Sequence, residues 1–163
     1  MRILEWTSAG LNRVSVEHVM RTTLAATASL AIAELFRLPE PSWSAISTMV
    51  VTQSTLGAAW TISGERFAGT ALGATAGALL ATYAGSGLPV FAAGIFALGM
   101  VCALLHLDRT AYRFAGITLI IVVIAASGPA WKIAMHRFFE VSLGIVIGLI
   151  MTAVWPERSA RAQ

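Results

Sequence analysis

The chain has 163 residues, of which 57% are hydrophobic and only 12% are charged, and its mean hydropathy is +0.77. A soluble domain carries roughly a quarter charged residues, so most of this chain is unsuited to contact with water. The net charge of +3 comes from basic residues scattered singly, and this excludes a nucleic-acid-binding surface, where such residues gather on one face. The composition therefore predicts an integral, all-α membrane protein.

Long stretches without charge predict six membrane-crossing helices, since each crossing needs about 20 apolar residues. Residues 1–16 are expected to lie along the membrane surface, or else to form a frayed end. Residues 17–156 then form one six-helix domain, and residues 157–163 form a cytoplasmic tail. The crossings are expected at Val19–Phe36, Pro41–Trp60, Phe67–Tyr83, Leu88–Leu105, Ala111–Ser127 and Ile133–Val154.

Basic residues predict the orientation, because arginine and lysine favour the cytoplasmic side of a membrane. With the N-terminus inside, the count is eight inside against three outside. This split predicts that both termini are cytoplasmic. The three outer residues are Arg37, Lys132 and Arg137.

Two segments, 60–77 and 131–148, resemble each other in sequence. They align at a fixed separation, here called the repeat offset, which is the separation of Trp60 from Trp131 and of Arg66 from Arg137. At this offset they share seven identities in 18 positions. The first copy opens the third predicted crossing and the second opens the sixth. Each repeat (about 17–83 and 88–155) thus holds three crossings, and the odd number predicts the inverted-topology arrangement typical of transporters.

Glycines spaced by four residues lie on both of these helices. Small residues at this spacing let helix backbones approach closely inside a bilayer. We expect them to pack helices together: Gly69, Gly73 and Gly77 on the third helix, and Gly144 and Gly148 on the sixth.

Arg66 and Arg137 are the candidate substrate-binding residues, because a charge near membrane depth costs about 2.5–3.5 kcal/mol on insertion scales and needs a reason. One interpretation is that each reaches the headgroups. The other is that each begins a helix at one mouth of a pathway and offers its planar guanidinium to a carboxylate, aided by the helix N-terminus.

Glu140 and His136 are candidates for proton coupling. Glu140 lies three residues after Arg137 and shares its helix face, so it is either a titrating carboxylate or the local ion partner of that arginine. His136 is a candidate because histidine is the residue type used for proton transfer near neutral pH, although a histidine near the membrane surface is more often inert.

The second predicted crossing is the most polar one. It carries a rough stripe of hydroxyls and one glutamine, and its candidate substrate contacts are Thr48, Thr52 and Gln53. The alternative is that these groups only hydrogen-bond to neighbouring helices.

Signatures of enzymes are missing from the sequence. It has no Gly-x-Ser-x-Gly elbow, no Walker-type loop and no His-Glu-x-x-His. We therefore expect no catalytic residue, no cofactor and no metal site.

Several motifs resemble the membrane unit of the fusaric acid resistance and aromatic acid exporter family. They begin at Trp43, at Arg66 (Arg-x-x-Gly-Thr-x-x-Gly), at Tyr112 and at Arg137, and the resemblance ends at Trp155-Pro156. It implies an inner-membrane, multi-pass secondary transporter that exports aromatic or related carboxylic acids, driven by protons. Larger members carry two such units, so the resemblance also implies a homodimer whose other partners are lipid and a small organic anion. A non-transporting scaffold, or an accessory subunit of a larger efflux assembly, is the alternative.

Overall fold

The computed structural model describes residues 13–53, 55–124 and 128–156, and the helices fill most of this part of the chain. Residues 1–12 of the expected surface segment 1–16, and the expected tail 157–163, lie outside the described residues, whereas residues 13–16 belong to the first described helix. Six α-helices and no strands occur in the described part. They are α2 (Arg13–Leu35), α3 (Ser42–Val51), α4 (Leu56–Tyr83), α5 (Leu88–Leu104), α6 (Arg109–Ile124) and α7 (Ala130–Val154).

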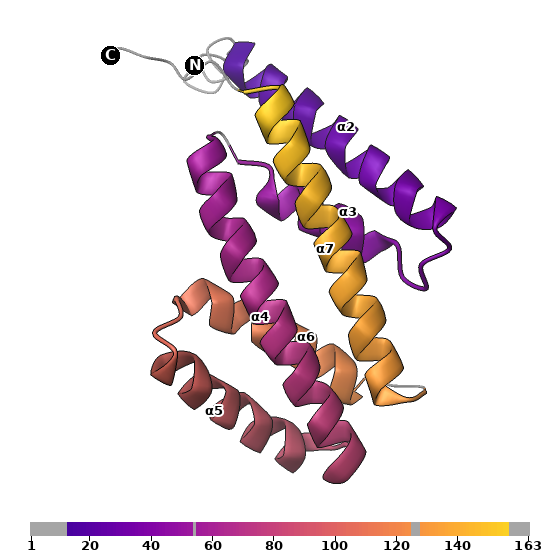
Figure 1. Ribbon diagram of the computed structural model, residues 1–163, viewed down its shortest axis with the longest axis vertical. Coiled ribbons are helices and arrows are strands. Elements are labelled where there is room, and N and C mark those ends of the chain that lie inside the picture. The colour runs from indigo at the N-terminus through magenta and orange to yellow at the C-terminus, as the bar shows by residue number, and fades with distance from the viewer. Residues whose placement is uncertain (1–12, 54, 125–127, 157–163) are drawn as a thin grey trace, which may run out of the picture.

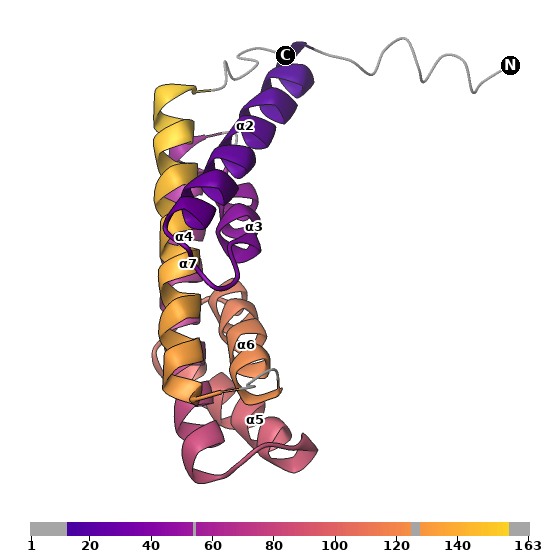
Figure 2. The ribbon, with the colours of Figure 1, turned by 90° about the vertical axis from the view of Figure 1, so that its right-hand side faces the viewer.

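The two long helices α4 and α7 run antiparallel along the length of the molecule (Figure 1). Figure 2 shows that they form one layer, while α3 and α6 lie one above the other against it. Helices α2 and α5 lie at opposite ends (Figure 1). The start of α2 and the end of α7 share one end of the molecule, where Arg21 Nη1 donates to the carbonyl of Trp155 at 2.9 Å.

The second predicted crossing, Pro41–Trp60, is wrong as a single helix. Helix α3 ends at Val51, and α4 begins at Leu56 and already contains Trp60. Thr52 leaves the helical conformation with ψ 92°, and the Thr55 side chain accepts a hydrogen bond from the Ala58 amide and caps α4. Hydroxyl side chains compete with the helix for backbone hydrogen bonds, which explains the break in this polar stretch.

Among the described helices, α7 is the one that is both long and apolar enough to cross a bilayer by itself. Helices α3 and α5 are apolar but shorter. With ten residues, α3 is about 15 Å long, roughly half of a hydrocarbon core.

The described helices pair crosswise between the two halves of the chain. Helix α4 packs mainly on α6, and α3 packs mainly on α7. At the first interface, Gly73 lies directly against the Ala115 carbonyl, and a side chain there would collide with backbone. At the second, Gly144 lies in the same way against the Ser44 carbonyl. Close backbone approach at small residues therefore holds both interfaces.

The contacts at the two interfaces recur at the repeat offset found in the sequence. That offset separates Gly73 from Gly144, and it also separates their partners Ser44 and Ala115. One turn further along, the same offset relates both glycines and both valines in the contacts Gly77–Val122 and Gly148–Val51.

The ends of α2 and α5 form the same cap. Arg37 and His106 are the two non-glycine residues with positive φ in the described chain, at 53° and 54°. The amide of each of these residues and the amide of the next residue donate back into the preceding helix, as in Leu38 to Ala33 and Leu107 to Cys102. This left-handed cap ends a helix and satisfies its last carbonyls.

Candidate functional site

Arg66 is the eleventh residue of α4, and its side chain is buried with 5% exposure. Its Nη2 donates to Ser47 Oγ at 3.1 Å, and its guanidinium carbon lies 4.6 Å from the centre of the Phe114 ring. In the described part of the chain, no carboxylate lies within ion-pair distance of Arg66, and its Nε has no hydrogen-bond partner. A ring face stabilises the cation only partly, so Arg66 is a buried charge without a counter-ion among the described residues.

Arg137 is the eighth residue of α7 and is 3% exposed. It stacks on an aromatic ring in the same way, 4.2 Å from the Trp43 ring centre. Unlike Arg66, it has two carboxylates: Nη2 lies 2.8 Å from Glu40 Oε2, and Nη1 lies 3.6 Å from Glu140 Oε2. The Glu140 Oε1 atom accepts the Glu40 amide at 2.8 Å.

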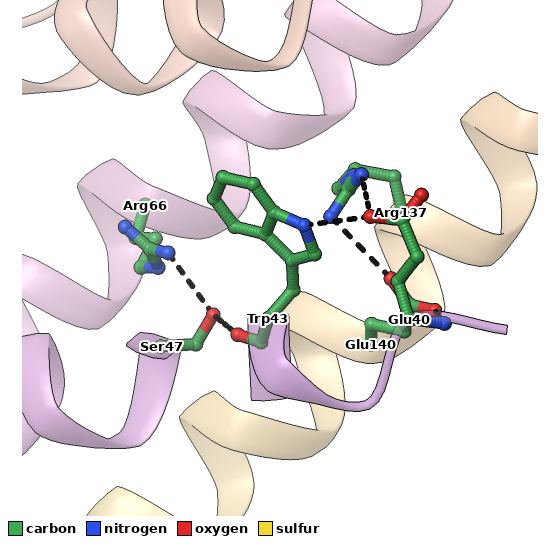
Figure 3. Close-up of polar contacts among 6 residues, drawn as sticks. All are labelled: Glu40, Trp43, Ser47, Arg66, Arg137 and Glu140. Carbon is green, nitrogen blue, oxygen red and sulfur yellow. Dashed lines mark hydrogen bonds and ion pairs between the residues drawn. The ribbon is translucent and has the colours of Figure 1, made fainter. Parts of the chain in front are cut away.

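These groups form one continuous polar chain across the protein interior, which can be followed in Figure 3. From Arg66 it passes to Ser47 Oγ, which donates to the Trp43 carbonyl at 2.7 Å. The Trp43 Nε1 atom donates to Glu40 Oε2 at 2.9 Å, and Glu40 leads to Arg137. The two arginines are therefore linked through α3 and the loop before it.

A small, largely enclosed central cavity lies between the two arginines. Its volume is about 10 Å³, room for about one water molecule. Both stacked arginine–aromatic pairs line it, together with Thr70, Ile117, Thr118, Ile121 and Val141. In this conformation the cavity is too small for an organic acid.

A larger pocket of about 490 Å³, here called the vestibule, lies beside the central cavity. It is lined by Pro39, Glu40, Ile121, Gly128, Pro129, Lys132, Ile133 and His136. Ile121 lines both spaces, and Glu40 joins the vestibule to Arg137. The hydrogen bond from Arg137 lowers the pKa of the Glu40 carboxyl below its ordinary value of 4.5, so Glu40 is ionised at neutral pH.

Two expectations about the arginines are wrong. Neither begins its helix, because α4 and α7 start ten and seven residues earlier, so no helix N-terminus adds positive potential at Arg66 or Arg137. Neither reaches outward to headgroups, since both are buried. The structure instead brings both to one central cavity.

The polar residues predicted on the second crossing lie away from this cavity. Thr48 Oγ1 donates to the carbonyls of Ser44 and Gly144, both at 3.0 Å, and Thr52 Oγ1 donates to the Thr48 carbonyl. Gln53 lies at the far end of α3, where its carbonyl accepts from Arg21 Nη2 at 2.8 Å. Thr48 therefore joins α3 to α7, while the Gln53 carbonyl holds the end of α3 to α2.

The two proton-coupling candidates take different places. Glu140 is 1% exposed and pairs with Arg137, whereas half-buried His136 lines the vestibule. Among the described residues, no group of three or more His, Cys, Asp or Glu side chains is arranged to hold a metal ion.

Sequence reasoning missed Glu40, Trp43 and Phe114. Glu40 lies between two prolines, and the sequence Pro-Glu-Pro is already accounted for as a helix-breaking turn. Trp43 is accounted for as an aromatic residue at the membrane interface. The signal was present in the repeat, because Trp43 and Phe114 are separated by the repeat offset, as are the arginines on which they stack.

The described helices form a bundle with two buried arginines at a polar centre. The sequence places this bundle in a known protein family. The profile of the fusaric acid resistance protein-like family matches residues 25–151, so the chain belongs to that family. It is 30% identical over 149 residues to the inner membrane protein YeeA of Escherichia coli K12. This alignment covers 88% of this chain and 42% of YeeA.

The chain is also similar to the uncharacterized transporter YdhK. The identity is 31% over 169 aligned positions in Escherichia coli K12 and 31% over 154 in Salmonella typhimurium, covering 98% and 87% of this chain. The chain spans 25% and 22% of the length of these two relatives. No solved structure is significantly similar to it.

Proposed function

We propose that this protein is a multi-pass inner-membrane transporter that exports small organic acids, most simply aromatic carboxylates. The membrane location is supported by the large apolar side chains on its surface, such as Phe96, Leu104 and Val154, which are 72–77% exposed. Water disfavours such a surface, whereas lipid solvates it. Relatives named an inner membrane protein and an uncharacterized transporter agree with this proposal.

In this proposal the chain is built from two inverted three-helix repeats, α2–α4 and α5–α7. The paired interface contacts, which recur at the repeat offset, support it, as do the matching caps after α2 and α5. The shared end of α2 and α7 fits two termini on one side, which we propose to be the cytoplasm. Helix α3 reaches only part of the way across.

The observation that carries the transport proposal is Arg66. A buried charge without a counter-ion costs several kcal/mol, and Arg66, which has none among the described residues, lies at the wall of a central cavity. An organic carboxylate would supply the missing counter-ion through a charge-assisted hydrogen bond. Arg66 is therefore the anion-binding residue of the closed conformation.

Transport requires this cavity to enlarge, because it has room for about one water molecule. The helices α4 and α7 cross beside it, where the rings of Phe67 and Phe138 lie 5.1 Å apart. The repeat offset separates these phenylalanines too, so equivalent residues of the two halves meet at the crossing point. We propose that separation at this point opens the cavity, with protons as coupling ion through Glu140 and His136, and that the protein works as a homodimer.

The test is flux by the purified chain in liposomes, with ¹⁴C-benzoate as substrate and an imposed pH gradient. Arg66→Gln is expected to abolish uptake, while Arg113→Gln, an exposed arginine on α6, leaves it unchanged. Equal flux in both variants would contradict the site. No flux by the folded wild-type chain would favour the accessory-subunit alternative, and flux independent of the pH gradient would favour a passive channel.

A further inference from the structure

A carboxylate-binding position lies where the vestibule meets the central cavity. Two donors converge there on one carboxylate oxygen: Arg137 Nη2 at 2.8 Å and Trp43 Nε1 at 2.9 Å from Glu40 Oε2. The indole also stacks on the guanidinium, which fixes the direction of both donors (Figure 3). A charged and a neutral donor aimed at one oxygen form a receptor for a carboxylate.

The carboxylate that now fills this receptor is poorly buried. The Glu40 side chain is 55% exposed and belongs to the loop between α2 and α3, whereas the second partner of Arg137, Glu140, is 1% exposed. Glu40 can therefore turn into water with little loss of packing. Water reaches the Glu40 side of this ion pair and screens it, so an external carboxylate can compete with Glu40 for Arg137.

We propose that Trp43 and Arg137 form the first binding site for the carboxylate of an exported acid, and that Glu40 occupies this site until the acid displaces it from the vestibule. The exchange conserves charge, because one carboxylate leaves Arg137 as another arrives. This inference rests on the proposed function and adds a site that precedes Arg66.

The vestibule indicates the class of ligand. Its volume of about 490 Å³ lies within the usual range for small-molecule sites. Ile121, Ile133 and two prolines give it apolar walls for a ring, and the polar side chains of Lys132 and His136 also line it. A monocarboxylate with one apolar ring, such as benzoate, fits this combination.

Ile121 links the two sites. It lines both the vestibule and the central cavity, so an acid held by Arg137 lies beside the route to Arg66. The polar chain from Trp43 through Ser47 to Arg66 follows the same direction. An acid that displaces Glu40 would therefore bind first at Arg137 and then pass to Arg66, its buried counter-ion.

The test is equilibrium binding of ¹⁴C-benzoate to the purified, detergent-solubilised full chain. Glu40→Ala is expected to lower the Kd about fivefold, equivalent to ~1 kcal/mol. Glu34→Ala, which removes an exposed carboxylate at the end of α2, is the matched control and should leave the Kd unchanged. The gain should persist in 0.5 M salt, where long-range attraction is screened to roughly 4 Å.

Two double variants test the receptor itself. Adding Trp43→Phe to Glu40→Ala keeps an aromatic ring but removes the Nε1 donor, and should cancel most of the gain. Adding Arg137→Gln should cancel all of it. Should Glu40→Ala fail to fold, Glu40→Gln replaces it, with a smaller gain expected because the amide oxygen still accepts a hydrogen bond.

The inference is overturned when the Glu40 variants bind benzoate no more tightly than Glu34→Ala, or when the gain survives the loss of Arg137. Failure of the proposed function has a different signature. Benzoate flux would then be insensitive to Arg66, whereas the binding gain on removal of Glu40 does not depend on flux.

Discussion

Placing a carboxylate beside Arg66 is the most direct perturbation of the proposed anion site. Ser47 Oγ lies 3.1 Å from Arg66 Nη2 and Ser47 is fully buried, so Ser47→Asp would give the arginine a permanent counter-ion. Ser47→Asn is the matched control, because it has the same size and shape without the charge.

The size of the effect follows from this geometry. Two unit charges about 4 Å apart attract by about 4 kcal/mol at an effective dielectric constant of about 20. Desolvation of the new carboxylate offsets part of this, which leaves about 2–3 kcal/mol, as for hydrogen bonds to charged groups. A substrate anion must overcome that amount, so its affinity falls about 30- to 150-fold.

The assay is initial ¹⁴C-benzoate uptake into liposomes at substrate concentrations below saturation. Ser47→Asn measures the steric cost of a larger side chain, and Ser47→Asp adds only the charge. Equal uptake by the two variants, with both folded, would refute the argument that Arg66 supplies the counter-charge for the substrate.

Three further changes test the packing and the ion pairs, each by thermal unfolding of the purified protein. Gly73→Ala should destabilise the folded protein by about 1–3 kcal/mol, because the new methyl group collides with α6. The control Gly64→Ala, on the same helix, meets nothing within 4 Å and should stabilise the protein slightly. Equal effects of the two substitutions would contradict the close approach of α4 and α6. Because the pKa of Glu40 is lowered in the folded state, its ion pair adds stability above the unfolded pKa and loses it as the pH falls through the folded pKa. The stability deficit of Glu40→Gln at pH 7 should therefore shrink as the pH falls below the ordinary carboxyl pKa of 4.5, and a constant deficit would exclude the ion pair as its cause. Arg21→Gln should destabilise by about 1.5–3 kcal/mol per lost charged hydrogen bond, because it releases two helix-end carbonyls, while exposed Arg37→Gln should have little effect.

The sequence predicted features that depend on local chemistry. Uncharged stretches located most helices, and the glycines spaced by four marked the faces where α4 meets α6 and α7 meets α3. The repeat offset identified Arg66 and Arg137 as equivalent positions. These features could be predicted because hydrophobicity and residue size are properties of each position by itself.

Features that depend on tertiary contacts could not be predicted. The polar side chains of α3 looked like a cavity lining, but Thr48 bonds across to Gly144. Charge counting placed the arginines on opposite sides of the membrane, yet the crossing of α4 and α7 brings both to one cavity. Within the described part of the chain, Arg137 has carboxylate partners and Arg66 has none. The reason is that Glu140 occupies the position of Gly69 in the other half and Glu40 that of Ala111, and this became visible only once the contacts were known.

The crosswise pairing of helices has a consequence for how the chain is assembled during synthesis. Helix α3 finds its main partner in α7, the last of the described helices to leave the ribosome, so the N-terminal half must wait in an incomplete state for the C-terminal half. Neither half buries its own glycine-lined face, and each of these faces is buried only when it packs against the other half. Two fragments divided between α4 and α5 and produced in one cell should therefore complement each other, whereas either fragment produced by itself should be degraded.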